Sequence, residues 1–373
     1  MTQPKTRNTD LLPEGLEDRL PASAERITTA MRACLDVLHG HSYERVRPPL
    51  LEFESSLASR MEGVKTRRMF RFVDPVSLQT LALRSDITPQ IGRIAATSMR
   101  DAPRPLRLAY CGDTALIKAS QLDPARERLQ LGGELIGADT VAAASEIVAL
   151  SIEALKAAGL TGISVDFTMP DLVDTIAAGD TSLDPDAIEA IRRELDTKDA
   201  GGLKAAGGAD YLPLLYATGP FDEAMSKLRE LDAGGALATR LDGLEQVAKR
   251  IGESARITLD PTERYGFEYQ TWFGFTLYAE GVRGAVGRGG TYKIGGSDEA
   301  ATGFTLYVDR LADAAELPGH DKWTVYLEAD HDPEAVRALL DQGHRVIGQL
   351  SADEDPAVMG CTHIMRGSDV QAV

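Results

Sequence analysis

The chain has 373 residues, which is enough for one large domain and one or two smaller ones. Its 40 basic and 57 acidic residues give a net charge of −17, which disfavours nucleic acid as a partner because binding phosphates requires a basic surface. The 43% hydrophobic content is typical of a soluble globular protein, and no run of about 18 apolar residues predicts a membrane span or a membrane partner.

Cysteine usage and the N-terminal residues both predict a cytoplasmic protein. Cys34, Cys111 and Cys361 are odd in number, far apart and without a CxxC pair, which favours reduced thiols over a disulfide framework or a zinc site. The opening residues MTQPKTRNTD have no apolar core, so no secretory signal is expected. The basic run KTRR at residues 65–68 is interpreted as a solvated loop, with a local nucleic-acid patch as the alternative.

The first 83 residues predict a helix and a pair of strands. Residues 10–21 form an irregular lead-in, and Ser23 is expected to cap a helix that ends at Gly40. Residues 43–51 (YERVRPPLL) are extended, but the double proline restricts them to an edge or an interface. Residues 69–73 and 78–83 are predicted as two antiparallel strands joined by an Asp-Pro turn. The apolar positions of the helix follow 3–4 spacing: Ile27, Met31, Cys34, Leu35 and Leu38.

Helices and strands alternate from residue 86 to residue 169. A helix over residues 86–99 is expected to have Asp86 or Thr88 as its cap and Pro89 at an early position. Strands are predicted at residues 106–110, 126–136 and 163–169, and an alanine-rich helix at residues 141–158. Residues 170–250 are predicted to be an all-helical insertion interrupted by Gly-Gly pairs.

Strands resume at residues 257–259 and 265–278. The run GRGGTYKIGG at residues 287–296 is interpreted as a glycine-rich turn between antiparallel strands, because it lacks the GxxxxGK[ST] and GxGxxG patterns of phosphate-binding loops. The following GFTLYVDRLADA is compatible with a helix, and the residues from Trp323 onward predict a small βαβ tail. The fold class is therefore α+β, with a mainly antiparallel sheet covered by helices.

Four polar residues predict a pocket for a small zwitterion. Gln130 and Glu134 are four positions apart on a predicted strand, so they face the same side. A buried glutamate needs a partner, and a ligand ammonium would serve. Asp86 and Thr88 lie at a strand-to-helix turn, where an N-cap explains the aspartate as well as a ligand does. A few convergent polar groups on an apolar wall are typical of small-molecule sites.

Catalytic patterns are missing from the sequence. It has no HExxH motif, no nucleophile elbow and no Cys-His constellation, so no catalytic residue, metal ion or cofactor is predicted. Arg310, in GFTLYVDRL, is expected on a helix that follows a strand, either exposed or in contact with an anion.

Several segments resemble the catalytic domain of class II histidyl-tRNA synthetases, over about residues 8–315. LLPEGLEDRLP and YERVRPPLLE resemble that family's N-terminal strip and dimer-interface motif. LALRSDITPQIGRIAA and LQLGGELIGAD resemble its second motif, and ITLDPTERYGFEYQTWFGFTLY with GRGGTYKIGG resembles its histidine-specific strands. GFTLYVDRL resembles the third motif, in which Arg310 matches the ATP-binding arginine.

Three departures distinguish the chain from active synthetases. The arginine that holds the α-phosphate in that family is matched by Leu116, in a segment that also contains Ala115 and Lys118, and its loss removes stabilisation of transition-state charge. The signature Arg-Gly-Leu-Asp-Tyr-Tyr is replaced by YGFEYQ at residues 265–270, with Arg264 one place off. A short tail replaces the anticodon-binding domain.

This set of losses, together with TLALRSDITPQIGRIAA and QLGGELIGA, resembles the regulatory subunits of ATP phosphoribosyltransferase. The resemblance implies a non-catalytic protein that partners the short-form catalytic subunit at the first step of L-histidine biosynthesis, with no tRNA charging. It also implies self-association as a dimer, L-histidine as a ligand and feedback regulation by histidine. The implied histidine-binding positions are Asp86, Thr88, Gln130, Glu134, Tyr269 and Gln270, with Arg310 as a remnant of the ATP site.

The implied architecture is a class II synthetase-like core over residues 1–170 and 251–318, a helical insertion over residues 171–250 and a small C-terminal α/β domain over residues 319–373. Two other hypotheses stay open. A truncated amino-acid-adenylating synthetase paralogue is favoured by Arg310 and opposed by Leu116 and Tyr265. A protein that only binds nucleic acid is opposed by the net charge.

Overall fold

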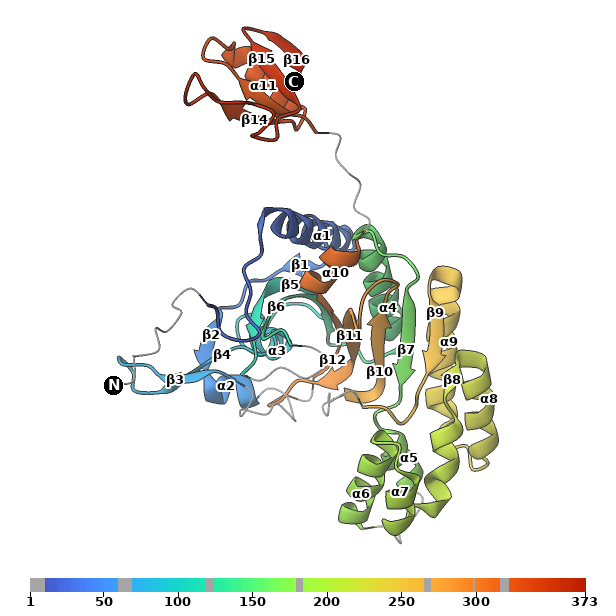
Figure 1. Ribbon diagram of the computed structural model, residues 1–373. Coiled ribbons are helices and arrows are strands. Elements are labelled where there is room, and N and C mark those ends of the chain that lie inside the picture. The colour runs from blue at the N-terminus through green and yellow to red at the C-terminus, as the bar shows by residue number, and fades with distance from the viewer. Residues whose placement is uncertain are drawn as a thin grey trace, which may run out of the picture. The chain divides into compact units, whose positions relative to one another are not determined.

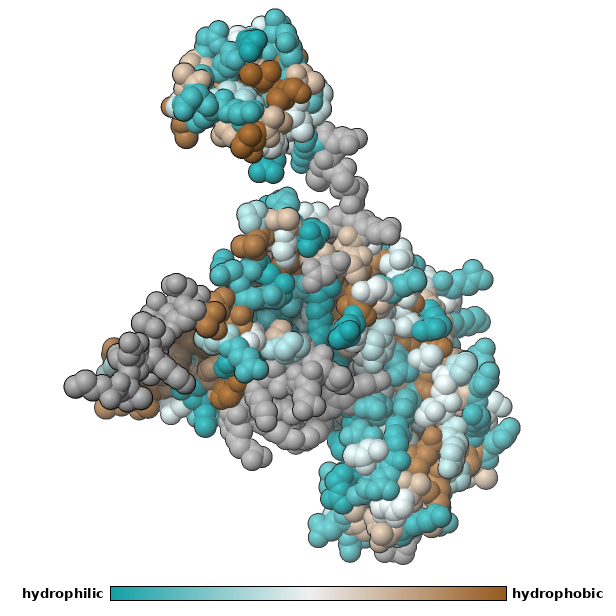
Figure 2. Space-filling model, in the orientation of Figure 1, coloured by the Kyte–Doolittle hydropathy of each residue, from teal (hydrophilic) through white to brown (hydrophobic). Residues whose placement is uncertain are grey.

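A computed structural model describes residues 11–59, 69–117, 124–178, 184–264, 270–297, 299–315 and 322–373. The chain consists of two compact units, Met1–Leu317 and Pro318–Val373. The expected lead-in over residues 11–20 has no helix or strand. Among the described helices, none combines the length and the apolar content that crossing a membrane requires. Hydrophilic side chains cover much of the face seen in Figure 2, as expected for a chain with a net charge of −17.

A nine-stranded sheet forms the centre of the first unit (Figure 1). Its neighbouring strands are antiparallel except for β1 with β5 and β7 with β9, which are parallel. The segment with the double proline therefore lies at an edge of the sheet, as predicted. In spatial order the strands are β1 (Glu44–Arg45), β5 (Leu106–Ala115), β6 (Glu127–Ile136), β12 (Ala300–Tyr307), β11 (Gly287–Lys293), β10 (Gln270–Tyr278), β7 (Ser164–Thr168), β9 (Arg256–Leu259) and β8 (Gly219–Pro220).

Helices cover the two faces of this sheet unequally. On one face, α1 (Pro21–Gly40), α4 (Val141–Ala157) and α10 (Val308–Ala314) enclose the larger apolar core (Figure 1). On the other face, α3 (Thr88–Ala96) buries Ile91 against alternate residues of β5, including Leu108. Because successive strand residues point to opposite faces, β5, β6 and β12 contribute to both cores.

The start of α1 differs from the prediction. The helix begins at Pro21, and Leu20 occupies the N-cap position, so Ser23 lies inside the first turn and does not cap it. Proline is favoured at the first helical position because its fixed backbone angle suits the helix and its missing N–H has no partner there anyway. The predicted end at Gly40 is confirmed.

A small three-stranded sheet lies between α1 and α3 in the chain. The strands β3 (Arg71–Val73) and β4 (Thr80–Leu83) form the predicted antiparallel pair, and β2 (Leu51–Phe53) adds to the other edge of β4. The helix α2 (Glu54–Ser59) contributes Leu57 to a small core beneath this sheet.

The segment predicted to be all helical also contains the short strand β8, which pairs with β9. Its apolar side chains, such as Ile191 and Leu228, belong to the same core as the central sheet. The separation of residues 171–250 as an insertion stays a prediction. The helical elements are α5 (Leu172–Ala177), α6 (Pro185–Asp196), α7 (Ala200–Ala205), η2 (Ala209–Tyr216), α8 (Phe221–Leu231), α9 (Ala238–Ile251) and η3 (Gly252–Ser254).

Two glycine-rich segments form strands where the sequence predicts a turn and a helix. GRGGTYK is strand β11, and the turn comes after it, at Gly295 and Gly296. GFTLY is the second half of β12, and only the VDRLADA part is helical, in α10. The glycines are there for close packing: a Cβ at Gly289 would lie 2.3 Å from the Phe275 ring.

The second unit is a four-stranded sheet with one helix. The order β14-β13-β15-β16 combines parallel pairs on both sides of β13 with an antiparallel last strand, which the sequence did not predict. Trp323 is stacked between the imidazole rings of His344 and His363, at centroid distances of 4.6 and 3.9 Å. The elements are β13 (Thr324–Leu327), α11 (Pro333–Asp341), β14 (Arg345–Gly348), β15 (His363–Arg366) and β16 (Asp369–Ala372).

Candidate functional site

Strand β6 carries the two polar residues from which the candidate site is built. Gln130 and Glu134 lie on the same face of the strand, and their side chains are almost completely buried, at 4% and 1% exposure. They point away from the large core, because the alternate residues Leu131 and Leu135 belong to it. The strand therefore places an amide and a carboxylate beneath α3, where polar groups need specific partners.

Three hydroxyl groups surround the Glu134 carboxylate. Tyr292 from β11 lies 2.9 Å from Oε2, while Thr88 from α3 and Tyr110 from β5 lie 3.2 and 3.3 Å from Oε1. The Tyr110 hydroxyl is also 2.6 Å from Thr305 Oγ1. Four strands and one helix thus supply the polar atoms of a single buried cluster, which we call the Glu134 cluster: Asp86, Thr88, Tyr110, Gln130, Glu134, Tyr292 and Thr305.

Gln130 connects this cluster to the turn before α3. Its Nε2 donates to Asp86 Oδ1 at 2.7 Å and to Thr305 Oγ1 at 3.0 Å, and its Oε1 accepts from the backbone N–H of Ile87 at 2.9 Å. Asp86 Oδ1 also accepts from the backbone N–H of Thr88 at 3.0 Å. The prediction that Asp86 or Thr88 caps the helix is wrong, because Ile87 occupies the N-cap position without a side-chain cap hydrogen bond and Thr88 is the first helical residue. Asp86 still contacts the helix start through Thr88 and belongs to the cluster.

Burial changes the acid–base chemistry of the cluster. Burial raises the pKa of the Glu134 carboxyl to about 8, the hydrogen bond from Tyr292 lowers it, and the nearby Asp86 raises it again. Burial likewise raises the pKa of Tyr110 well above its usual value. Glu134 is thus mostly protonated at neutral pH. A cationic group brought by a ligand would favour its charged form.

Glycines make room for these side chains. Gly303 on β12 is paired directly with Glu134, and a Cβ at Gly303 would lie 1.6 Å from Glu134 Oε2. A Cβ at Gly132 would lie 2.5 Å from the Tyr110 hydroxyl. The Gln-Leu-Gly-Gly-Glu and Thr-Gly-Phe-Thr runs are therefore shaped around the buried carboxylate.

The other predicted site residues are located less completely. Tyr269 and Lys118 lie outside the described residues, and the structure describes only the backbone of Gln270, at the start of β10. Arg310 lies on α10, as predicted, and its Nη1 donates to the backbone carbonyl of Ala285 at 2.7 Å. The guanidinium groups of Arg310 and Arg128 lie 5.8 and 5.1 Å from the ring centre of Tyr307.

Arg84, which no pattern in the sequence singles out, anchors the turn before α3. Arg84 is 5% exposed, and its guanidinium donates to the backbone carbonyls of Asp113 at 2.7 Å and Pro48 at 2.9 Å. It also lies 3.3 Å from Gln90 Oε1, and Gln90 Nε2 donates to Glu52 at 2.8 Å. This network ties the three-stranded sheet to the first turn of α3. The sequence feature that could have indicated a role for Arg84 is its position as a charged residue directly after an apolar strand.

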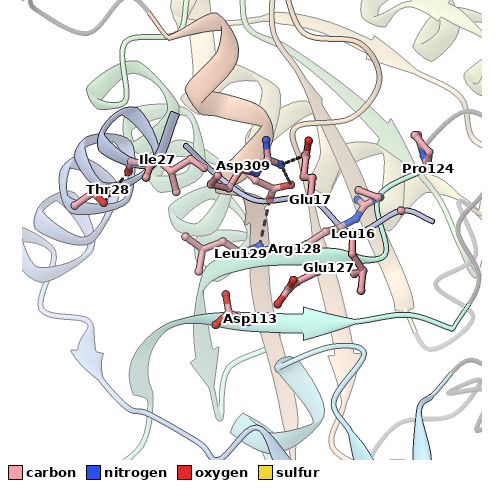
Figure 3. A pocket seen from close by; sticks show the side chains of 14 residues that line it. Leu16, Glu17, Ile27, Thr28, Asp113, Pro124, Glu127, Arg128, Leu129 and Asp309 are labelled. Carbon is pink, nitrogen blue, oxygen red and sulfur yellow. Dashed lines mark hydrogen bonds and ion pairs between the residues drawn. The ribbon is translucent and has the colours of Figure 1, made fainter. Parts of the chain in front are cut away.

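A separate cavity of about 650 Å³ lies on the opposite face of the sheet (Figure 3). Leu129, the neighbour of Gln130 on β6, lines it together with residues of α1, such as Ile27. Because adjacent strand residues point to opposite faces, the cavity and the Glu134 cluster lie back to back across the sheet. The remaining lining residues are Gly15, Leu16, Glu17, Arg19, Ala24, Thr28, Asp113, Pro124, Ala125, Glu127, Arg128 and Asp309.

Comparisons with known proteins match the chain along most of its length. The histidyl-tRNA synthetase family profile matches residues 15–311. Relatives from Rhodospirillum centenum and Paramagnetospirillum magneticum, each named ATP phosphoribosyltransferase regulatory subunit, are both 38% identical to this chain. The alignments cover 97% of this chain and 96% of the first relative, and 96% of this chain and 97% of the second.

A solved structure shares the fold. The crystal structure of an ATP phosphoribosyltransferase regulatory subunit/histidyl-tRNA synthetase from Bacillus halodurans superposes with a TM-score of 0.80 at 26% identity. The superposition covers 96% of this chain and 97% of that chain. The predicted class II synthetase-like α+β fold is confirmed.

Proposed function

The chain belongs to the histidyl-tRNA synthetase-like family of ATP phosphoribosyltransferase regulatory subunits, and we propose that it regulates that enzyme by forming a complex with its catalytic subunit. The observation that carries this conclusion is the alignment with relatives of that name over 97% of the chain at 38% identity. The role predicted from the sequence, a regulatory subunit at the first step of L-histidine biosynthesis, is thereby confirmed. The alternative of an amino-acid-adenylating enzyme is not favoured.

Three finer parts of the proposal go beyond the family. The catalytic partner is of the short form, the chain associates with itself as a dimer, and L-histidine binds at the Glu134 cluster. The last part is supported by the side chains of Glu134 and Gln130, which are nearly inaccessible to water. Both are hydrogen-bonded to residues at the start of α3, and their described partners include no cationic side chain. A histidine ligand supplies an ammonium group and ring N–H groups, both of which suit acceptors such as Asp86 and Glu134.

The first experiment tests regulation. The rate of phosphoribosyl transfer by a short-form catalytic subunit is measured alone and with increasing amounts of this chain, each with and without L-histidine. Binding of the chain is expected to raise the rate, and histidine to lower the rate of the complex, because an effector acts by binding the two states with different affinity. A rate that the chain leaves unchanged, with and without histidine, would contradict the proposed function.

The second experiment tests the histidine site by itself. In Gln130→Leu, the amide that joins Asp86, Ile87 and Thr305 is replaced by an apolar side chain of similar size. Calorimetric titration of the purified chain is expected to show histidine binding at least 10-fold weaker than in the wild type, because hydrogen bonds to charged groups are worth about 1.5–3 kcal/mol.

Gln246→Leu is the matched control. Gln246 lies on the exposed side of α9, where its amide bonds only the backbone carbonyl of Asp242 at 3.2 Å. This variant is expected to bind histidine as the wild type does. Equal affinity of all three proteins would exclude the Glu134 cluster as the histidine site while leaving regulation untouched.

A further inference from the structure

The cavity on the α1 side of the sheet has walls that the fold holds in place. One wall is formed by the N-terminal strip, residues 11–20, which crosses the ends of β5 and β6 (Figure 3). The backbone N–H of Arg126 donates to the Gly15 carbonyl at 2.8 Å, and Arg126 Nη1 donates to the Glu14 carbonyl at 3.2 Å. Gly15 has a φ of +79°, and a Cβ there would lie 2.4 Å from the Pro124 carbonyl oxygen. The strip is thus fixed where it crosses the sheet.

The cavity combines apolar and acidic groups. Leu16, Ile27 and Leu129 give it an apolar part, and the carboxylates at its wall come from four different segments. Figure 3 shows Asp309 and Glu17 on one side of the cavity and Asp113 and Glu127 on the other.

Charge is unevenly balanced between these two sides. Arg19 bridges Glu17 at 2.7 Å and lies 3.9 Å from Asp309, and the charge of Arg128, which also lines the cavity, acts on Asp309, so two arginines balance the first pair of carboxylates. Asp309 also accepts from the backbone N–H of Leu129 at 3.2 Å. Asp113 and Glu127 are both exposed to solvent on neighbouring strands, pointing to the same face as Leu129. The side formed by these two carboxylates is therefore the place where a positive charge is stabilised.

We propose that this cavity binds an ammonium or guanidinium group carried on an aliphatic chain, with the cation at Asp113 and Glu127 and the chain against Leu16, Ile27 and Leu129. Its volume of about 650 Å³ is within the range of small-molecule sites, about 300–1,000 Å³. Two sources can supply this chemistry: a free organic cation, or a lysine or arginine side chain of the catalytic subunit. Only the second source rests on the proposed function.

The cavity and the Glu134 cluster share strand β6. Leu129 faces the cavity and Gln130 the cluster, and the Asp309 carboxylate holds the backbone of Leu129. Tyr307, two positions before Asp309, pairs with Gln130 across β12 and β6.

The test uses agmatine as the free cation and the full chain. Calorimetric titration is expected to show agmatine binding to the wild type at least 10-fold tighter than to the double variant Asp113→Asn/Glu127→Gln. The control Asp222→Asn/Glu223→Gln removes the same charge from the exposed first turn of α8 and is expected to bind like the wild type. Circular dichroism and urea denaturation check that each variant is folded.

A second arm identifies the source. Assembly of each protein with the short-form catalytic subunit is measured by native mass spectrometry. Weaker assembly of the double variant alone identifies a side chain of the partner, whereas agmatine binding that is lost with assembly unchanged identifies a free cation. Agmatine binding that is absent or equal in all three proteins, with equal assembly, overturns the proposal. A wild type that fails to assemble contradicts the proposed function instead, and the agmatine titration still decides about the cavity.

Discussion

Replacing Glu134 with glutamine is expected to raise the free energy of unfolding at pH 8–9, on the order of 3–4 kcal/mol, and to leave it nearly unchanged at pH 5. The cause is burial, which raises the pKa of this carboxyl to about 8 in the folded chain from 4.5. Between pH 4.5 and about pH 8, the folded state holds a proton on Glu134 that the unfolded state has released. Stability therefore falls as the pH rises through this window, and glutamine, which does not ionise, removes that loss.

Urea denaturation of wild type and Glu134→Gln at intervals from pH 5 to pH 9 measures the effect. All other titrating groups are common to both proteins, so the difference between the two curves isolates Glu134. Glu146→Gln is a useful contrast, because the hydrogen bond from Arg107 lowers the pKa of Glu146, so its titration lies below pH 4.5 and its loss should cost the same stability at every pH from 5 to 9. A pH-independent difference for Glu134→Gln would show that this carboxyl is ionised throughout.

Replacing Gly303 with alanine is expected to lower the free energy of unfolding by about 3 kcal/mol and to abolish histidine binding. The new methyl group would lie 1.6 Å from Glu134 Oε2, and moving the carboxylate away would break its hydrogen bonds with three hydroxyl groups. Urea denaturation and calorimetric titration of the same variant measure both effects.

Two further variants make this prediction specific. Gly40→Ala places a methyl group at the last residue of α1, where no atom lies within 4 Å, and is expected to change stability by less than about 0.5 kcal/mol. In a Glu134→Ala background, the cost of Gly303→Ala should become small, because the overlapping side chain is gone. An unchanged cost in that background would locate the strain elsewhere.

Part of the Glu134 cluster could be predicted because it is written in local patterns. The four-residue spacing of Gln130 and Glu134 on a strand fixes their common face. Polar residues near a helix start point to Asp86 and Thr88, although Ile87 and neither of these two occupies the N-cap position. Tyr110, Tyr292 and Thr305 could not be found in this way. They meet Glu134 only through the register of β5, β11 and β12, and register depends on pairings that no local pattern contains.

Glycine caused the main errors in predicting the fold. The sequence favours a turn at GRGGTYKIGG because glycine is most common where the backbone bends. In the structure, Gly289 and Gly303 lie within strands, where their missing side chains admit the Phe275 ring and the Glu134 carboxylate. The cavity could not be predicted, because one of its walls is an irregular strip whose position depends on contacts with residues about 110 positions away.

The pairing of β6 with β12 also determines when the nine-stranded sheet can be completed during synthesis. Ile136 pairs with Ala301, 165 positions later, and Gln130 pairs with Tyr307, 177 positions later. At a ribosomal rate of about 5–20 residues per second, β6 waits on the order of 10 s for its neighbour. During this time it has one open edge, and Glu134 remains in water and ionised. Closure of the sheet, desolvation of the carboxylate and the ability to bind a ligand therefore arrive together, as a late step of folding that is slow because the contacts it forms are so distant in sequence.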